Sequence, residues 1–396
     1  MLPPRPTGLT FLIADTGGAL ARLTALEGFA RAALVGVIPL IAYEALGSKE
    51  AVARTYLLAA IFTLFVTLNF GRLERLLHRR WVLTLSGVLL VVASVLMYTA
   101  SGWVFALGIG LRSAAASLFT VCMSLYIMDY IQKHEFARTE SRRMLLNGIS
   151  WLLGPLVGIW LWEHTLPVSA FIASACAASL LVAYFWYLRL GDNPVLVAAK
   201  PRQAVHPLRL LPRYFSQKLL RIAYLITLSR GMFWVMVYVY GPIYAVEAGL
   251  PTWVGAALLS AGCAMLFLSP LIRRMAERFN TKNVLMLGLG VSGGCMLALG
   301  LLGEAKPWGL LFWWLGGLGA SLVDVLGNIP FMRSVKPYER IEMTMVFSTW
   351  REMSELLTPL GISLVLLLFP FHVFYYTLGA FLLLAALAAS SLPKRV

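Results

Sequence analysis

The chain has 396 residues, of which 60% are hydrophobic and only 13% are charged, and its mean hydropathy is +0.79. Soluble domains carry about 25% charged residues, so this composition excludes an ordinary soluble protein and indicates a polytopic membrane protein. The formal net charge of +15 comes mainly from Lys and Arg in short loops beside apolar stretches. That placement is typical of membrane topology and does not indicate a nucleic-acid partner.

Apolar stretches of bilayer length predict an all-α membrane protein with twelve transmembrane helices. The predicted helices cover residues 21–46, 52–71, 81–101, 103–129, 144–163, 166–189, 219–247, 252–272, 283–303, 307–331, 341–369 and 371–392. The segments 71–80 and 273–282 between them are expected to be basic loops.

The first predicted helix carries two charged residues, Glu27 and Arg31, among apolar neighbours. A charge near the middle of a spanning helix costs about 2.5–3.5 kcal/mol on insertion scales, so such residues usually face a bundle interior or a wet cavity. We therefore expect Glu27 to be functional. The spacing of four residues also allows a simple pair with Arg31 on one helix face.

An internal repeat organises the chain. The stretch 116–156 matches 320–360 without a gap, and 24–47 has an echo at 227–250 that aligns Glu27 with Arg230. Six helices per copy give two pseudo-symmetric, parallel six-helix bundles, which is a transporter architecture. The predicted domains are residues 1–190, a linker at 191–217, and residues 218–396. Glu27 and Arg230 thus place opposite charges at equivalent depths in the two halves, as expected if a binding site lies between them.

Basic residues mark one side of the membrane. They gather in the loops at 71–80, 132–143, 190–218, 273–282 and 332–340, whereas the opposite loops carry few. By the positive-inside rule, both termini and the linker are cytoplasmic. We expect an integral protein of a bacterial-type inner (plasma) membrane.

A loop signature resembles that of the major facilitator superfamily, G-x-L-x-D-R-x-G-R-R. In the first half Gly71, Arg79 and Arg80 fit it, although Arg75 stands at the Asp position; in the second half Glu277 and Arg278 fit. The resemblance covers nearly the whole chain. It implies the major facilitator fold and a cytoplasmic gating role for these residues.

The fifth predicted helix is similar to the glycine and proline signature of drug-proton antiporters. Gly154, Pro155 and Gly158 carry the similarity, and Arg112 stands where those exporters have an embedded Arg. Pro removes a backbone hydrogen bond and Gly lets helices approach closely, so these residues are conformational candidates. Ordinary small-residue packing is the alternative.

The resemblance also implies that helices 1, 4, 7 and 10 line a cavity. Embedded charged residues fall on those four helices, and helix 11 adds Arg351, Glu352 and Glu355. The substrate or proton-binding candidates are Glu27, Arg31, Arg112, Arg230, Asp324 and Glu352. Asp324 has no helical partner three or four residues away, so we expect it to pair with Arg112 or Arg230; Arg351 and Glu355 are expected to pair with each other.

These features predict a secondary transporter that moves a small solute by alternating access. Transport is expected to be proton-coupled export. An importer or uniporter of a small organic anion, and a receptor or scaffold that does not transport, are the alternatives. No enzyme motif, metal spacing or cofactor site occurs in the sequence. The expected partners are a small-molecule substrate, protons or another cation, and the lipid bilayer, and the expected state is a monomer.

Overall fold

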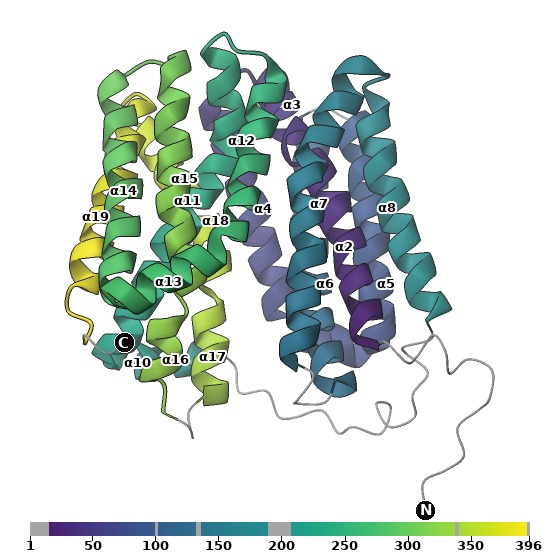
Figure 1. Ribbon diagram of the computed structural model, residues 1–396. Coiled ribbons are helices and arrows are strands. Elements are labelled where there is room, and N and C mark those ends of the chain that lie inside the picture. Colours follow the sequence, from purple (N-terminus) through teal and green to yellow (C-terminus); the bar gives the residue numbers. More distant parts are fainter. Residues whose placement is uncertain (1–15, 100–101, 132–135, 189–206, 337–339, 394–396) are drawn as a thin grey trace, which may run out of the picture. The chain divides into compact units, whose positions relative to one another are not determined.

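The computed structural model describes residues 16–99, 102–131, 136–188, 207–336 and 340–393 (Figure 1). Within these ranges every regular element is a helix and no strand occurs. The chain is therefore an all-α membrane protein, as its composition predicts. The helices fall into two compact units, which are described separately.

The first unit comprises Met1–Leu34 and Ile61–Arg202. Leu23, Leu83, Tyr126 and Phe185 are buried at its core. Its helices are α2 (Thr16–Val35), the second half of α4 (Lys49–Leu68), α5 (Phe70–Thr99), α6 (Trp103–Tyr130), α7 (Phe136–His164) and α8 (Val168–Tyr187).

The second unit comprises Val35–Ala60 and Gln203–Val396. It includes a hairpin made of α3 (Val37–Leu46) and the first half of α4. Its other helices are α10 (Pro207–Ser216), α11 (Lys218–Glu247), α12 (Thr252–Ala264), η2 (Met265–Leu268), α13 (Ser269–Phe279), α14 (Thr281–Leu302), η3 (Pro307–Gly309), α15 (Leu310–Leu326), α16 (Ile329–Ser334), α17 (Arg340–Ser348), α18 (Trp350–Leu366) and α19 (His372–Ala389). The predicted domain boundaries at 190 and 218 stay a prediction.

Ten helical segments in the described ranges are long and apolar enough to cross a membrane. An eleventh is the pair α12 and α13, which is bent by 54°. The remaining predicted span, 341–369, consists of α17 and α18, which are interrupted at Thr349. Because neither piece reaches eighteen residues, this span is a broken helix rather than one continuous helix.

The expectation that 71–80 and 273–282 are loops was wrong. Both segments are helical over most of their length, in the first part of α5 and in α13. Arg, Glu, Leu and Met are good helix formers, and neither segment has a proline or glycine in its helical interior after Gly71. The backbone bends sharply at His78 within α5 and at Asn280, which follows α13.

Glycine pairs hold helices of the second unit close together. A Cβ atom at Gly288 of α14 would lie 2.6 Å from the carbonyl oxygen of Gly319 of α15. A Cβ atom at Gly293 of α14 would lie 3.0 Å from the carbonyl oxygen of Gly379 of α19. In lipid, where helices gain little from the hydrophobic effect, this close approach supplies the van der Waals contact that joins them.

Residues of the predicted linker form α10, which packs against the second unit. Leu210 and Tyr214 are buried in an aromatic cluster with Phe331 and Phe347, and α10, α16 and α17 lie at the same end of the unit (Figure 1). The Tyr214 hydroxyl donates to the Leu220 carbonyl oxygen at 3.0 Å. Burial raises the pKa of the Tyr214 hydroxyl, so it stays protonated as a donor.

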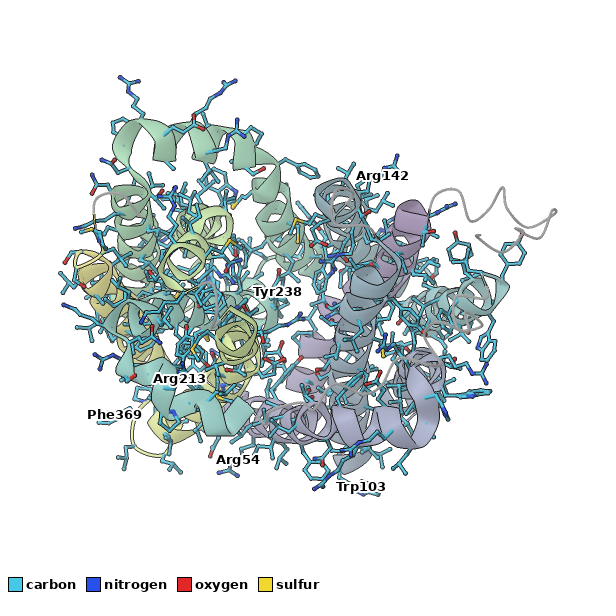
Figure 2. The ribbon with its side chains drawn as sticks, turned by 90° about the horizontal axis from the view of Figure 1, so that it is seen from below. Arg54, Trp103, Arg142, Arg213, Tyr238 and Phe369 are labelled. Atoms are coloured by element: carbon cyan, nitrogen blue, oxygen red, sulfur yellow. The ribbon has the colours of Figure 1, made fainter. Side chains whose placement is uncertain are left out.

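The opposite face of α10 is exposed, and Arg213 lies at the edge of the unit (Figure 2). The apolar face of this short amphipathic helix is thus occupied by protein. Residues 191–206 of the predicted linker lie outside the described residues.

Candidate functional site

The first candidate site lies on α2 of the first unit. Arg31 Nε lies 2.5 Å from Glu27 Oε1, and Arg31 Nη2 donates to Glu27 Oε2 at 3.3 Å. The Glu27 side chain is only 2% exposed. The pair forms because residues four apart lie on one helix face. Burying both charges together avoids the much larger cost of burying either one alone.

Two neighbouring helices fix Arg31 in place. Its guanidinium lies over the ring of Trp151 of α7, 5.2 Å from the centroid. Arg112 of α6 donates from Nη2 to the backbone carbonyl oxygen of Arg31. Arg31 and Arg112, both predicted from sequence, are therefore in contact, and Arg31 joins them to Glu27. Trp151 was not among the predicted residues, because aromatic side chains are common in every span.

The glycine and proline signature explains why α7 reaches this pair. A Cβ atom at Gly154 would lie 2.9 Å from the carbonyl carbon of Ala32 in α2, and one at Gly158 would overlap the carbonyl of Ala33. Pro155 lies inside α7 between these two contacts. The predicted close helix approach is confirmed. The gating role of Gly154, Pro155 and Gly158 stays a prediction.

The second candidate site lies between α11 and α15 of the second unit. Arg230 Nη1 lies 3.2 Å from Asp324 Oδ1, and the Trp234 indole Nε1 donates to Asp324 Oδ2 at 2.9 Å. The exposed fraction is 7% for the Arg230 side chain and 18% for Asp324. Of the two partners expected for Asp324, the structure thus selects Arg230. Both carboxylate oxygens are engaged.

Aromatic rings surround this pair. The Arg230 guanidinium lies over Trp350 of α18, 4.3 Å from the ring centroid, and Trp234 stacks on Tyr238 one turn along α11 with centroids 5.8 Å apart. Rings hold a guanidinium by cation–π attraction without adding a charge. Trp234 was not among the predicted site residues, because an aromatic side chain in a span can face either a cavity or lipid. The one feature of the sequence that could have indicated its role is its spacing of four residues from Arg230, which places both side chains on one face of the helix.

The charged group on α18 has simpler explanations. Arg351 Nε lies 3.4 Å from Glu355 Oε1, and both side chains are about 40% exposed (43% and 38%), so this predicted pair is present and contributes little. Glu352 lies half-buried in the first turn of α18. A carboxylate there complements the positive end of the helix dipole, which is a structural reason for its presence.

No cluster of three or more His, Cys, Asp or Glu side chains suited to a metal ion occurs among the described residues. The two charged sites are built from ion pairs, a backbone acceptor, an indole donor and aromatic rings. What such sites can do chemically is bind charged groups and exchange protons.

A family model described as the Major Facilitator Superfamily matches residues 20–313. This match covers most of the chain. The chain belongs to the Major Facilitator Superfamily. Members of this superfamily are transporters, and the chain is accordingly a membrane transporter and not an enzyme. A search of curated proteins found no match.

Solved structures of superfamily transporters share the fold. A POT family transporter in complex with 5-aminolevulinic acid is 12% identical, with 94% of each chain covered and a TM-score of 0.75. A peptide transporter POT in complex with sulfate is 14% identical, covers 95% of this chain and 94% of its own, and has a TM-score of 0.72. The nucleoside transporter NupG is 15% identical, covers 94% and 98%, and has a TM-score of 0.72. At these identities the likeness shows the fold alone.

An ion pair stabilises the first copy of the superfamily loop signature. Arg79 Nε donates to Glu74 Oε1 at 2.8 Å, and the Arg79 guanidinium lies over Tyr126 of α6, 5.7 Å from the ring centroid. Arg75, which replaces the signature Asp, donates to the carbonyl oxygen of Gly71 at 3.1 Å. Glu74 thus supplies a carboxylate one residue from the place where the signature has one. Arg80 follows Arg79 in the same helix.

The second copy is more exposed. Glu277 Oε1 lies 3.4 Å from Arg273 Nε, with 65% and 76% of the side chains exposed, and Arg278 lies over Phe279 at 5.4 Å. A surface pair of this kind contributes about 0–1 kcal/mol. The gating role of Glu277 and Arg278 therefore stays a prediction, as does that of Gly71, Arg79 and Arg80.

Both copies keep the backbone bend of the signature without its glycine. His78 and Asn280 stand at the position of the second signature Gly, and they have φ 59°, ψ 150° and φ 69°, ψ 141°. They are the only non-glycine residues with positive φ in the described ranges. This region of backbone conformation is strongly disfavoured for residues with a Cβ atom. The repeated bend shows that the fold, rather than the residue, imposes it.

Proposed function

We propose that this superfamily member is a proton-coupled exporter of a small solute and that Asp324 is its coupling carboxylate. The observation that carries the proposal is the buried contact of Asp324 with Arg230 and Trp234. An embedded carboxylate beside one guanidinium can either form an ion pair with that cation or bind a proton. Two such states give a transporter a way to sense protons.

The proposed step at Asp324 is a proton transfer only. A proton bound to Asp324 neutralises the carboxylate, so Arg230 loses its ionic partner but keeps the ring of Trp350. The freed guanidinium is then available to an anionic group or to another acceptor. Loss of the proton restores the ion pair. Solute and proton are coupled because both change what Arg230 contacts.

The Glu27–Arg31 pair is the second proposed coupling element. Its carboxylate is more deeply buried than that of Asp324, at 2% against 18% exposed, and Arg31 is held by Trp151 and Arg112. The deeper burial of Glu27 favours a fixed role, such as presenting Arg31 to a solute, over frequent exchange of a proton. Asp324 is therefore the first choice for coupling.

Export, rather than import, is supported by the drug-proton antiporter-like signature at Gly154, Pro155 and Gly158, which packs directly on the helix of Glu27.

We further propose a monomer in a bacterial-type inner membrane with both termini cytoplasmic. Single cysteines at Ala199 and Ala305 test this topology. An impermeant thiol reagent added to intact cells should label the Ala305→Cys protein and not the Ala199→Cys protein; equal labelling contradicts the topology.

Transport is tested in proteoliposomes. A melting-temperature screen of peptides, nucleosides, organic acids and cationic drugs identifies a ligand of the purified protein. Flux of that ligand should follow an imposed proton gradient in the parent and in Glu355→Gln, which alters only an exposed pair. Asp324→Asn should bind the ligand and lose gradient-driven flux. Flux that ignores the gradient in the parent contradicts proton coupling, and no flux at all favours a receptor.

A further inference from the structure

A group of five aromatic side chains lies inside the second unit. Trp313 of α15 packs against Tyr244 of α11, with ring centroids 6.0 Å apart, and against Tyr375 of α19, with centroids 5.9 Å apart. Phe371, at the start of α19, lies 5.3 Å from Tyr375 and 5.0 Å from Tyr240 of α11, again between ring centroids. These five residues, called the aromatic cluster below, join α11, α15 and α19 through ring contacts.

Two polar atoms of the aromatic cluster are buried without a hydrogen bond. Trp313 is 1% exposed and Tyr240 is 2% exposed, so bulk solvent does not reach them. Trp313 Nε1 and the Tyr240 hydroxyl form no hydrogen bond with any residue in the described part of the chain. A buried polar group that stays unsatisfied costs about 1–3 kcal/mol, and the large majority of buried side-chain polar atoms have a partner. Two such atoms in one cluster therefore require an explanation.

The backbone does not supply partners for these two atoms. A buried Ser or Thr hydroxyl can bond a carbonyl oxygen of its own helix, as Thr227 does with Ala223 and Ser321 with Gly317 in the same unit. The polar atoms of Trp and Tyr lie on the far side of a rigid ring, away from their own helix. Carbonyl oxygens of neighbouring spans are already used by the hydrogen bonds within each helix. The partner must therefore be another side chain or a water molecule.

Side chains beside the cluster that can accept a hydrogen bond are engaged elsewhere. The Tyr244 hydroxyl donates to the Lys306 carbonyl oxygen at 3.0 Å and accepts from the Lys306 backbone N–H at 3.1 Å. Glu247, three residues further along α11, accepts a hydrogen bond from Tyr43 and pairs with Lys49. An indole nitrogen only donates, so its partner must be an acceptor. Water is an acceptor small enough for a buried cluster, and it can also bond a tyrosine hydroxyl.

We propose that the aromatic cluster is a binding site for ordered water, which accepts a hydrogen bond from Trp313 Nε1 and bonds the Tyr240 hydroxyl. Buried waters typically make about three hydrogen bonds. Tyr375, whose ring packs on Trp313, brings a further hydroxyl group to the same cluster. The site goes beyond the proposed function, because it involves none of the coupling candidates and needs no solute.

X-ray radiolysis of the purified full-length protein tests the site. Hydroxyl radicals formed from a bound water oxidise the side chains beside it, even where bulk solvent is excluded. Corrected for intrinsic reactivity, Tyr240 and Trp313 should be oxidised at least about fivefold faster than Tyr214, which is 0% exposed and whose hydroxyl bonds the Leu220 carbonyl oxygen. Trp308, which is 55% exposed, gives the rate for bulk access. Rates at Tyr240 and Trp313 equal to that at Tyr214 overturn the proposal.

Tyr240→Phe removes one hydroxyl and keeps the ring. If water bonds this hydroxyl, the substitution should lower the melting temperature by about 1–3 °C, the shift expected for the loss of one hydrogen bond of ordinary strength. Tyr244→Phe is the control of known direction, because it removes two hydrogen bonds to Lys306 and should also lower the melting temperature. An unchanged or raised melting temperature in Tyr240→Phe shows that the hydroxyl is dry and unpaired, and overturns the proposal.

A polar group of the solute is the other possible acceptor, and ligand binding separates it from water. The ligand found by the melting-temperature screen should bind Tyr240→Phe within about twofold of its affinity for the parent, because a water that stays in place is not replaced by the ligand. A loss of affinity of about tenfold or more would assign the site to the solute and overturn the water site. Radiolysis uses no solute, so failure of this site is distinguishable from failure of the transport proposal.

Discussion

Gly158 of α7 lies against the backbone of Ala33 of α2 so closely that a Cβ atom on Gly158 would stand 2.6 Å from the carbonyl carbon of Ala33. The backbone of α2 cannot yield as a flexible side chain would. The two helices are therefore held at a distance that only glycine permits, and the buried Glu27–Arg31 pair lies within two turns of Ala33 on the same helix.

The first prediction follows from this contact. Gly158→Leu should lower the melting temperature and the yield of folded protein strongly, because the two helices must separate to admit the side chain. Gly148→Leu is the matched control, since the space beside Gly148 on the same helix is open. Thermal unfolding of both purified variants gives the measurement. Equal stability of Gly158→Leu and Gly148→Leu would contradict the close contact.

The second prediction concerns the bends at the loop signature. His78→Gly and Asn280→Gly should each raise stability by about 1 kcal/mol, because the positive φ costs a residue with a Cβ atom about 1–3 kcal/mol and the added chain entropy of glycine cancels part of the gain. Leu76→Gly, at an exposed helical position of the same segment, should instead lower stability by about 0.5–1 kcal/mol. Melting temperatures decide between these signs, and a loss of stability in both bend variants contradicts the account.

The third prediction concerns the pair of Arg230 with Asp324. Asp324→Asn should lower stability more than the double variant Asp324→Asn with Arg230→Gln, because a lone buried charge costs about 3–5 kcal/mol while a neutral pair does not. Rescue on removing both partners identifies direct coupling. Additive losses in the thermal unfolding of the single and double variants would show that the two residues do not act as a pair.

The sequence predicts most of the fold because hydropathy and charge are averaged over twenty residues at a time. It misses the broken span at α17 and α18, the helical loops, and the grouping of Val35–Ala60 with the second unit, since these depend on local hydrogen bonds and on contacts between distant segments. Helix geometry alone predicts the pair of Glu27 with Arg31, which are four residues apart.

Contacts between distant residues were harder to predict. The sequence limited the expected partner of Asp324 to Arg112 or Arg230, because an embedded carboxylate needs a cation. Only the packing of α11 on α15 selects Arg230. Trp234 and Trp350 were missed because an indole ring in an apolar span is as compatible with lipid as with a charged site. The hydrogen bond that the Tyr43 hydroxyl donates to Glu247 was not predicted either, because the two residues are 204 positions apart in the chain.

The most direct test of proton coupling measures protons taken up or released when the ligand binds to the purified protein in a weakly buffered solution. The account predicts a pH-dependent proton exchange in the parent and in Glu355→Gln, and its loss in Asp324→Asn with ligand binding retained. A proton exchange in Asp324→Asn equal to that of the parent would contradict the assignment of Asp324 as the coupling carboxylate.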